Sequence, residues 1–213
     1  MENNNSILMP ELKCGNWKGK LVVFCGVDGA GKTTQINNVS KMLSKKGYKV
    51  FCTFQPSRHV RDSEVFKLAH SKDIEKINYT AMLLMTVGDR IHHCTYEIRR
   101  HLQDGEIVLC DRYIYTTIAN MMVEDKLDQP WFKGVVKDIF KPDIVFLMDV
   151  DSEIAIERIK ARPEEKDIVD EGYIRKMVDA YRMLAQYNNM ILIDSSRMLD
   201  DVSDKIVENL LDK

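Results

Sequence analysis

One stretch near the N-terminus has the residue types and spacing that bind phosphate groups. Residues 24–34 read FCGVDGAGKTT, in which Gly26, Gly31, Lys32 and Thr33 fill the pattern G-x-x-x-x-G-K-[ST]. Glycines permit positive φ angles and let backbone N–H groups approach phosphate oxygens closely. Lys32 is expected to reach the β- and γ-phosphates, and the Thr33 hydroxyl to bind Mg²⁺. The pattern predicts a nucleoside triphosphate site.

A second pair of chemically capable residues, Asp111 and Arg112, directly follows the apolar run at 106–110. A carboxylate at the end of a buried strand can hold Mg²⁺, directly or through water. The planar guanidinium beside it can bind a phosphate through two parallel hydrogen bonds. A local ion pair or a helix cap is the alternative interpretation.

The elements that must position these residues are apolar runs separated by helical patterns. A β-branched run precedes the phosphate-binding stretch, and a helical pattern begins at Lys32. Because the runs are continuous rather than alternating, we expect parallel strands buried on both faces. The prediction is an α/β fold with roughly five parallel strands, helices on both faces, and the active site beyond the strands' carboxyl ends. The five runs are at 21–24, 49–54, 106–110, 144–149 and 190–193.

The composition of the chain limits the partners and the cellular compartment that we expect for it. The chain has 213 residues, a formal net charge of -2 and five cysteines. A charge this small gives no basic field for nucleic acid, and an odd cysteine count without regular spacing is typical of reduced thiols. No apolar run is long enough for a membrane span, so we expect a cytoplasmic protein without membrane or nucleic-acid partners. Cys25, Cys52 and Cys110 lie in apolar runs and are predicted to be core residues.

The motifs resemble those of the thymidylate kinase family. The resemblance rests on GVDGAGKTTQ at 26–35, Asp-Arg-Tyr at 111–113 and Lys-Pro-Asp at 141–143, and it extends from residue 19 to the C-terminus. It implies a three-layer P-loop kinase domain over 19–213 with a lid near 158–170, preceded by an extension at 1–18. It also implies nucleotide substrates, ATP with Mg²⁺, transfer of the γ-phosphoryl group to a deoxynucleoside monophosphate, usually dTMP, and a homodimer.

The resemblance also assigns roles to residues. Asp28 would approach the sugar 3′-hydroxyl, Arg112 would bridge the acceptor phosphate and the transferring group, and Arg90 would hydrogen-bond the pyrimidine base. The expected catalytic residues are Lys32, Asp111, Arg112, Arg158 and Arg162, with Thr33 and Asp111 holding Mg²⁺. The expected ATP-binding residues are Gly26, Asp28, Gly29, Ala30, Gly31, Lys32, Thr33, Thr34, Arg158, Ser195 and Arg197. The expected acceptor-binding residues are Asp28, Phe54, Pro56, Arg58, Met85, Thr86, Arg90, Arg112, Thr116, Thr117 and Asn120.

Two arginines near the expected lid are included among the catalytic residues because the phosphate loop itself contains no arginine. Some relatives have an arginine in the phosphate loop directly after the aspartate, where this chain has Gly29. Another cation must then meet the charge that develops on the transferring group. Arg158 and Arg162, beside the break in the helical pattern at 163–167, are the predicted replacements, and a solvated charged helix is the alternative.

Several acceptor-side positions depart from the family pattern. Met85 and Thr86 occupy the region where relatives carry a phenylalanine that stacks on thymine. Thr116 replaces the usual serine, and Asn120 replaces an aromatic residue that packs on the sugar and disfavours a 2′-hydroxyl. These departures leave open a modified nucleotide or another small phosphorylated molecule as the acceptor. A nucleotide-dependent switch without acceptor turnover is the alternative of another class.

The expected acceptor explains why no general base stands out in the sequence. A phosphate monoester has its second pKa near 6 and is therefore a dianion at neutral pH. A nucleoside kinase would instead need a carboxylate near the second strand's end to deprotonate a hydroxyl. The segment at 54–58 reads FQPSR, without a carboxylate. This favours a nucleoside monophosphate kinase.

Overall fold

The protein is built on one parallel five-stranded sheet. The computed structural model describes residues 5–69, 77–162 and 170–212. The strand order is β2-β3-β1-β4-β5, and every neighbouring pair is parallel. This confirms the predicted α/β fold and its five parallel strands. The strands are β1 (Lys20–Cys25), β2 (Val50–Phe54), β3 (Ile107–Asp111), β4 (Ile144–Asp149) and β5 (Ile191–Asp194).

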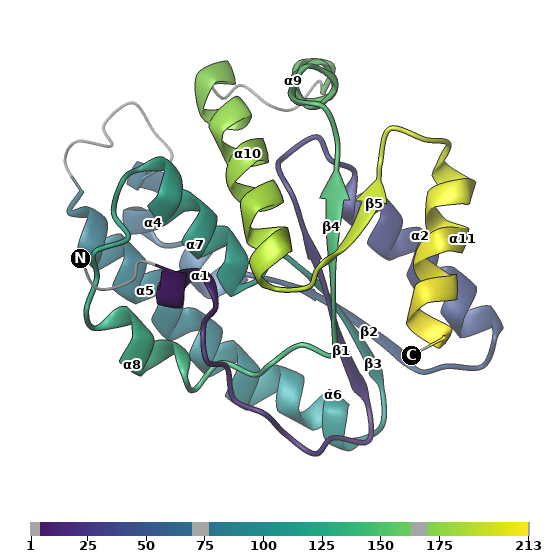
Figure 1. Ribbon diagram of the computed structural model, residues 1–213. Helices are drawn as coiled ribbons and strands as arrows, with labels where there is room; N and C mark the ends of the chain where they lie inside the picture. The colour runs from purple at the N-terminus through teal and green to yellow at the C-terminus, as the bar shows by residue number, and fades with distance from the viewer. Residues whose placement is uncertain (1–4, 70–76, 163–169, 213) are drawn as a thin grey trace.

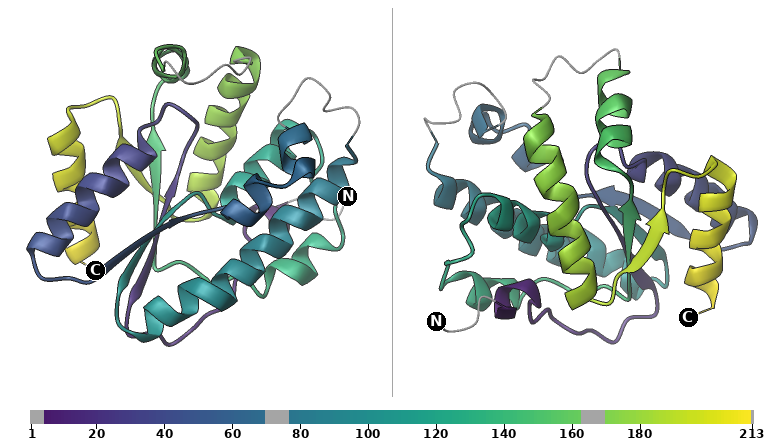
Figure 2. Two further views of the ribbon diagram at one scale, coloured as in Figure 1. Left: turned by 180° about the vertical axis from the view of Figure 1, so that it is seen from behind. Right: turned by 45° about the horizontal axis from the view of Figure 1, so that its top comes forward.

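Helices cover both faces of the sheet and make the three layers. Figure 1 shows α2 and α11 on one face and α5, α7 and α10 on the other, an arrangement that both views of Figure 2 repeat. The described helices are α1 (Asn5–Leu8), α2 (Lys32–Lys45), α3 (Arg58–Arg61), α4 (Glu64–Ala69), α5 (Tyr79–His93), the π-helical turn η2 (Cys94–Ile98), α6 (Arg99–Gln103), α7 (Ile114–Val123), α8 (Phe132–Val136), α9 (Ser152–Lys160), α10 (Glu171–Tyr187) and α11 (Leu199–Leu211).

Burial follows strand position in the sheet. The central strands β1, β3 and β4 are buried along nearly their whole length, whereas β2 and β5 lie at the edges and expose part of theirs. Cys25 and Cys110 are buried, as predicted, but Cys52 is exposed. The prediction for Cys52 was wrong because β2 has a neighbour on one side alone, so its apolar run marks an edge strand.

The long helix expected over 78–103 is interrupted by one wide turn. Asn78 caps its start by accepting a hydrogen bond from the Ala81 N–H at 3.1 Å. The π-helical turn η2 then links α5 to α6 without a break in direction. Turns of this kind inside helices are often found near functional sites. Here it lets His93, at the end of α5, contact Glu97 at 2.6 Å and Thr53 of β2 at 3.0 Å.

The segment before β1 packs against the domain. Ile7 and Leu8 are buried, and the Leu8 carbonyl accepts a hydrogen bond from Asn188 at 2.7 Å. Lys13 forms an isolated parallel bridge with Phe140. The described part of the expected extension therefore adds to the core, while residues 1–4 lie outside the described residues. Within the described chain, no helix has both the length and the apolar character for a membrane crossing, and the five cysteines are free thiols.

Candidate active site

The candidate site lies where the carboxyl ends of the parallel strands meet. The phosphate loop follows β1, Asp111 and Arg112 end β3, and the Gln55–Pro56 cis peptide follows β2. Strand β4 leads into α9 at the same end of the sheet (Figure 1). A parallel sheet thus brings these loops together although they are distant in the sequence.

The phosphate loop depends on glycine conformation and on a buried lysine. Gly26, Gly29 and Gly31 have φ angles of 134°, 79° and 81°. The Lys32 side chain lies inside the loop, where its ammonium group donates a 2.8 Å hydrogen bond to the Val27 carbonyl. Burial and, to a smaller extent, the nearby Arg112 charge lower the pKa of Lys32 to about 8, against the opposing effect of Asp28 and Asp111. An anion such as a phosphate would therefore stabilise the charged lysine.

Helix α9 lies directly on the phosphate loop. A Cβ atom on Gly29 would come within 2.4 Å of the Ala155 carbonyl oxygen, so no other residue type fits beneath α9 without a shift. Arg158 of α9 donates hydrogen bonds to the Gly29 carbonyl at 3.3 Å and the Ser195 carbonyl at 3.1 Å. The packing of α9 on the phosphate loop therefore explains why position 29 holds a glycine and not an arginine. The same packing brings Arg158 close to the loop.

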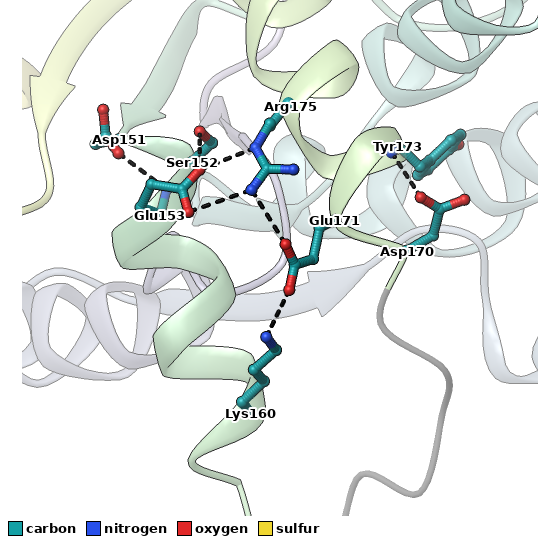
Figure 3. A network of polar contacts seen from close by, with 8 residues as sticks. All are labelled: Asp151, Ser152, Glu153, Lys160, Asp170, Glu171, Tyr173 and Arg175. Atoms are coloured by element: carbon teal, nitrogen blue, oxygen red, sulfur yellow. Dashed lines mark hydrogen bonds and ion pairs between the residues drawn. The ribbon is translucent and has the colours of Figure 1, made fainter.

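A surface network joins α9 to α10 beside the expected lid (Figure 3). Arg175 contacts Glu153 of α9 at 2.9 Å and Glu171 of its own helix at 3.1 Å, and Lys160 contacts Glu171 at 2.5 Å. Exposed ion pairs of this kind contribute little each, about 0–1 kcal/mol, but together they link the helix that carries Arg158 to the sheet-covering α10. Of the lid expected near 158–170, residues 163–169 lie outside the described residues.

Asp111 and Thr33 form the donor set expected for a divalent cation. The Thr33 hydroxyl donates a 2.8 Å hydrogen bond to Asp111 Oδ2. The other oxygen, Oδ1, is buried and has no hydrogen-bond partner among the described residues. A buried carboxylate oxygen without a partner is costly unless a ligand reaches it. Two hard oxygen donors in this state fit Mg²⁺, which binds few protein groups and keeps several waters.

Arg112 is held in an uncommon backbone conformation beside the phosphate loop. Its φ is 66°, and its N–H donates to the Phe24 carbonyl of β1 at 2.9 Å. Non-glycine residues rarely adopt such angles, and those that do cluster at functional sites. The Arg112 guanidinium is 15% exposed and forms an ion pair with Asp28. Burial would raise the pKa of Asp28, but the charges of Arg112 and Lys32 hold it at about 2.

Arg90 of α5, predicted to bind the acceptor, is a buried cation. It is 2% exposed, which excludes the solvated helical arginine that α5 alone would predict. Its Nη1 donates to the Thr86 carbonyl at 2.8 Å, and its Nε has no partner in the described part of the chain. Burial lowers the pKa of Arg90 to about 10. The unpartnered N–H is free to bind a polar group of a ligand.

Two tyrosines of α10 contact residues that were predicted to bind the acceptor, and sequence reasoning did not identify them. The Tyr173 hydroxyl donates to Asn120 Oδ1 at 2.8 Å, and the Tyr181 hydroxyl donates to Thr116 Oγ1 at 2.8 Å. Both contacts join α10 to α7. Their signal in the sequence, two tyrosines eight residues apart, does not distinguish a site from an ordinary helix packing face.

The turn after β2 presents two arginines in different directions. Arg58 is exposed and lines a groove of about 310 Å³ on the outer side of β2, which His92 and Tyr96 also line. Arg61 is half-buried, and its guanidinium lies over the Phe54 ring at 4.6 Å. The structure also brings Asp89 of α5 to this turn, a carboxylate that the local sequence lacks, but both its oxygens accept hydrogen bonds from Ser57.

The other expected site residues are placed as follows. Ser195 is buried and its N–H donates to the Asp149 carbonyl at 2.8 Å, while Arg197 is exposed and pairs with Asp194 at 3.0 Å. Arg162 is exposed, and its charge is among those that lower the pKa of Asp28. Ala30, Pro56 and Thr117 are buried, Met85 is half-buried and Thr34 is exposed. Their roles as binding residues stay predictions.

The fold and the site define a P-loop nucleotide-binding protein, and comparison with known proteins gives the family. The family model for thymidylate kinase matches residues 24–206. The probable thymidylate kinase of Methanocaldococcus jannaschii is 35% identical over 189 residues, 87% of this chain and 93% of the relative. That of Sulfurisphaera tokodaii is 34% identical, covering 89% and 94%, and the thymidylate kinase of Caldicellulosiruptor saccharolyticus is 29% identical, covering 92% and 99%. The chain belongs to the thymidylate kinase family, which confirms the resemblance.

The contact between α9 and the phosphate loop predicts a difference between two glycines. Both Gly29→Ala and Gly31→Ala place a side chain in the left-handed region, at a cost of about 1–2 kcal/mol. Only at Gly29 does the new Cβ meet a backbone oxygen, whereas nothing lies within 4 Å at Gly31. Gly29→Ala should therefore lower the free energy of unfolding by about 1–3 kcal/mol more than Gly31→Ala. Urea unfolding without nucleotide measures this, and equal losses would contradict the contact.

The Asp28–Arg112 pair predicts a pH dependence. Because the folded-state pKa of Asp28 is about 2 and its usual value is 3.8, the pair stabilises the fold fully above pH 3.8 and loses this contribution as the pH falls towards 2. The difference in unfolding free energy between wild type and Asp28→Asn should be constant near neutral pH and shrink below pH 4. Unfolding measured at several pH values tests this, and a carboxyl resonance of Asp28 titrating near 3.8 would contradict it.

Proposed function

We propose that this protein transfers the γ-phosphoryl group of ATP to dTMP, giving dTDP and ADP. The observation that carries the proposal is the position of Asp111 and Arg112 beside the phosphate loop. Asp111 contacts Thr33, and Arg112 contacts Asp28. A carboxylate suited to a cation and a guanidinium suited to phosphate are thereby adjacent to a triphosphate-binding loop. The similarity to proteins named thymidylate kinase supports dTMP as the acceptor.

The donor side has the groups that would hold ATP. Backbone N–H groups of residues 26–34 and the Lys32 ammonium would bind the β- and γ-phosphates. Binding would draw Lys32 from the Val27 carbonyl to a phosphate oxygen, a stronger acceptor. Arg158 of α9 and Arg162, just beyond that helix, are the cations that would approach the transferring group. Ser195 and Arg197 would lie towards the adenine.

Thr33 and Asp111 are the residues that would hold Mg²⁺. The unpartnered Asp111 Oδ1 and the Thr33 hydroxyl supply the oxygen donors. Bound Mg²⁺ neutralises charge on the phosphate oxygens during transfer. Asp111 would also orient Thr33 through the hydrogen bond between their side chains.

The acceptor side supports a monophosphate rather than a nucleoside. A dianionic phosphate needs no general base, and Asp89, the carboxylate that contacts the β2 turn at Ser57, has both oxygens occupied by hydrogen bonds from that residue. Arg112 would align the acceptor phosphate, and the free Nε of Arg90 would donate to the pyrimidine base. Catalysis would then consist of positioning and charge stabilisation.

A modified nucleotide is the second candidate acceptor. Asn120, which accepts a hydrogen bond from Tyr173, stands at the position where the family pattern has an aromatic residue, and its amide can hydrogen-bond a substituent that a ring would exclude. We further infer from the family that the enzyme is a cytoplasmic homodimer, which light scattering of the purified protein would test.

ADP release against a panel of acceptors tests the proposed function. With ATP and Mg²⁺, dTMP should give the highest kcat/KM, above dUMP, other nucleoside monophosphates and thymidine. Removal of Mg²⁺ with a chelator should abolish release, because charge on the phosphates is then uncompensated. ATP consumption that does not depend on any acceptor would support the switch alternative and contradict the proposal. Turnover of a modified nucleotide but not dTMP would favour the second candidate.

A further inference from the structure

Helix α9 carries Arg158 over the phosphate loop but shares little of the hydrophobic core. Of its three buried residues, Ala155 belongs to the main core, whereas Ile156 and Ile159 are buried outside it. Ala155 lies against the loop itself, where its carbonyl oxygen excludes a side chain at Gly29. Apolar burial therefore fixes α9 less firmly than a helix that packs on the sheet, and polar contacts contribute more to holding it.

Helix α10 is the firmly packed neighbour of α9. All its buried residues belong to the main core. The Asp170 carboxylate caps its start by accepting a hydrogen bond from the Tyr173 N–H at 2.9 Å. A similar cap fixes the start of α9, where Asp151 accepts from the Glu153 N–H at 2.9 Å. The first turns of both helices are thus fixed, and with them the backbones of Glu153 and Glu171.

A network of polar contacts joins one face of α9 to α10 (Figure 3). Arg175 contacts both carboxylate oxygens of Glu153, through Nε at 2.9 Å and Nη2 at 3.3 Å, and its Nη2 also contacts Glu171 at 3.1 Å. Glu171 in turn accepts from Lys160 at 2.5 Å. Glu153 and Lys160 lie about two helical turns apart, so they project from the same face near opposite ends of α9. The network therefore holds α9 to α10 at two points.

Arg158 lies on the other side of the same helix. At 3.6 residues per turn it is about 140° around the helix from Glu153, and it donates to the Gly29 and Ser195 carbonyls. Ala155, which meets the phosphate loop, also lies away from Glu153. Helix α9 is thus held between the phosphate loop on one side and α10 on the other, and a shift of α9 would move Arg158 relative to the loop.

We propose that Arg175 is a positioning residue, which keeps Arg158 over the phosphate loop by holding α9 against α10. Exposed ion pairs are weak singly, but a guanidinium with two parallel contacts to one carboxylate and a third to another restricts the geometry of all three side chains. Arg175 acts through Arg158 and not by contact with a substrate. The inference rests on the proposed function, because Arg158 must contact ATP.

A double-mutant cycle tests whether Arg175 acts through Arg158. Calorimetry with Mg²⁺ gives the affinity for a non-hydrolysable ATP analogue, and kcat is measured with ATP and dTMP. Arg175→Gln should lower the affinity, kcat or both by about 3- to 10-fold, the range that a few exposed ion pairs supply. In the Arg158→Gln background the same change should have an effect below about 1.5-fold, since the side chain that it positions is gone. Arg175→Lys should retain part of the effect of Arg175, because it keeps the charge without the two-point contact.

Arg182→Gln is the matched control. Arg182 also lies on α10, is 44% exposed against 45% for Arg175, and contacts both oxygens of one carboxylate. That carboxylate, Asp149, belongs to β4 and not to α9. This variant should change the affinity and kcat by less than about twofold.

The outcomes separate this inference from the proposed function. Equal effects of Arg175→Gln and Arg182→Gln, additive effects of Arg175→Gln and Arg158→Gln, or no effect of Arg175→Gln would overturn the positioning role. A wild type that binds the analogue but transfers no phosphoryl group to dTMP would contradict the proposed function, while the binding cycle still decides the role of Arg175. Failure of the wild type to bind the analogue would overturn both.

Discussion

The ion pair between Arg112 and Asp28 is the contact on which the arrangement of the site depends. It joins the end of β3 to the phosphate loop after β1, and so ties the proposed acceptor side to the proposed donor side. The chain accepts a left-handed backbone at Arg112 to aim the guanidinium there, and the hydrogen bond to Phe24 holds that backbone against β1. This backbone conformation is sustained because the neighbouring strands β1 and β3 are buried along nearly their whole length.

The cations around the Arg112–Asp28 pair are oriented by the backbone rather than by carboxylates. Besides Arg112, other elements bring cations to this end of the sheet: Lys32 from the loop and Arg158 from α9. Both are held by backbone carbonyls, which orient a cation without neutralising it. The site is therefore preorganised for anions, and ligand phosphates would supply the missing negative charge.

The sequence was sufficient for the sheet and the phosphate loop, because local patterns determine both. Continuous apolar runs indicated parallel strands, and the spacing of Gly26, Gly31 and Lys32 has few other uses. It was insufficient where an outcome depends on neighbours distant in the chain. Cys52 is exposed because β2 is an edge strand, and strand order is not written in any single run. Likewise, Arg58 is exposed and Arg61 lies over the Phe54 ring because of the direction in which a one-turn helix faces. The Tyr173–Asn120 contact joins two helices whose pairing no motif predicts.

The fate of the γ-phosphorus tests the account most directly. ATP labelled at the γ-phosphate would be incubated with the protein, Mg²⁺ and dTMP, and the products separated. The label should appear in dTDP in proportion to the ADP formed, with little inorganic phosphate, because cations aligned on both substrates would deliver the group to the acceptor rather than to water. Label found in inorganic phosphate, at a rate that dTMP does not change, would contradict it.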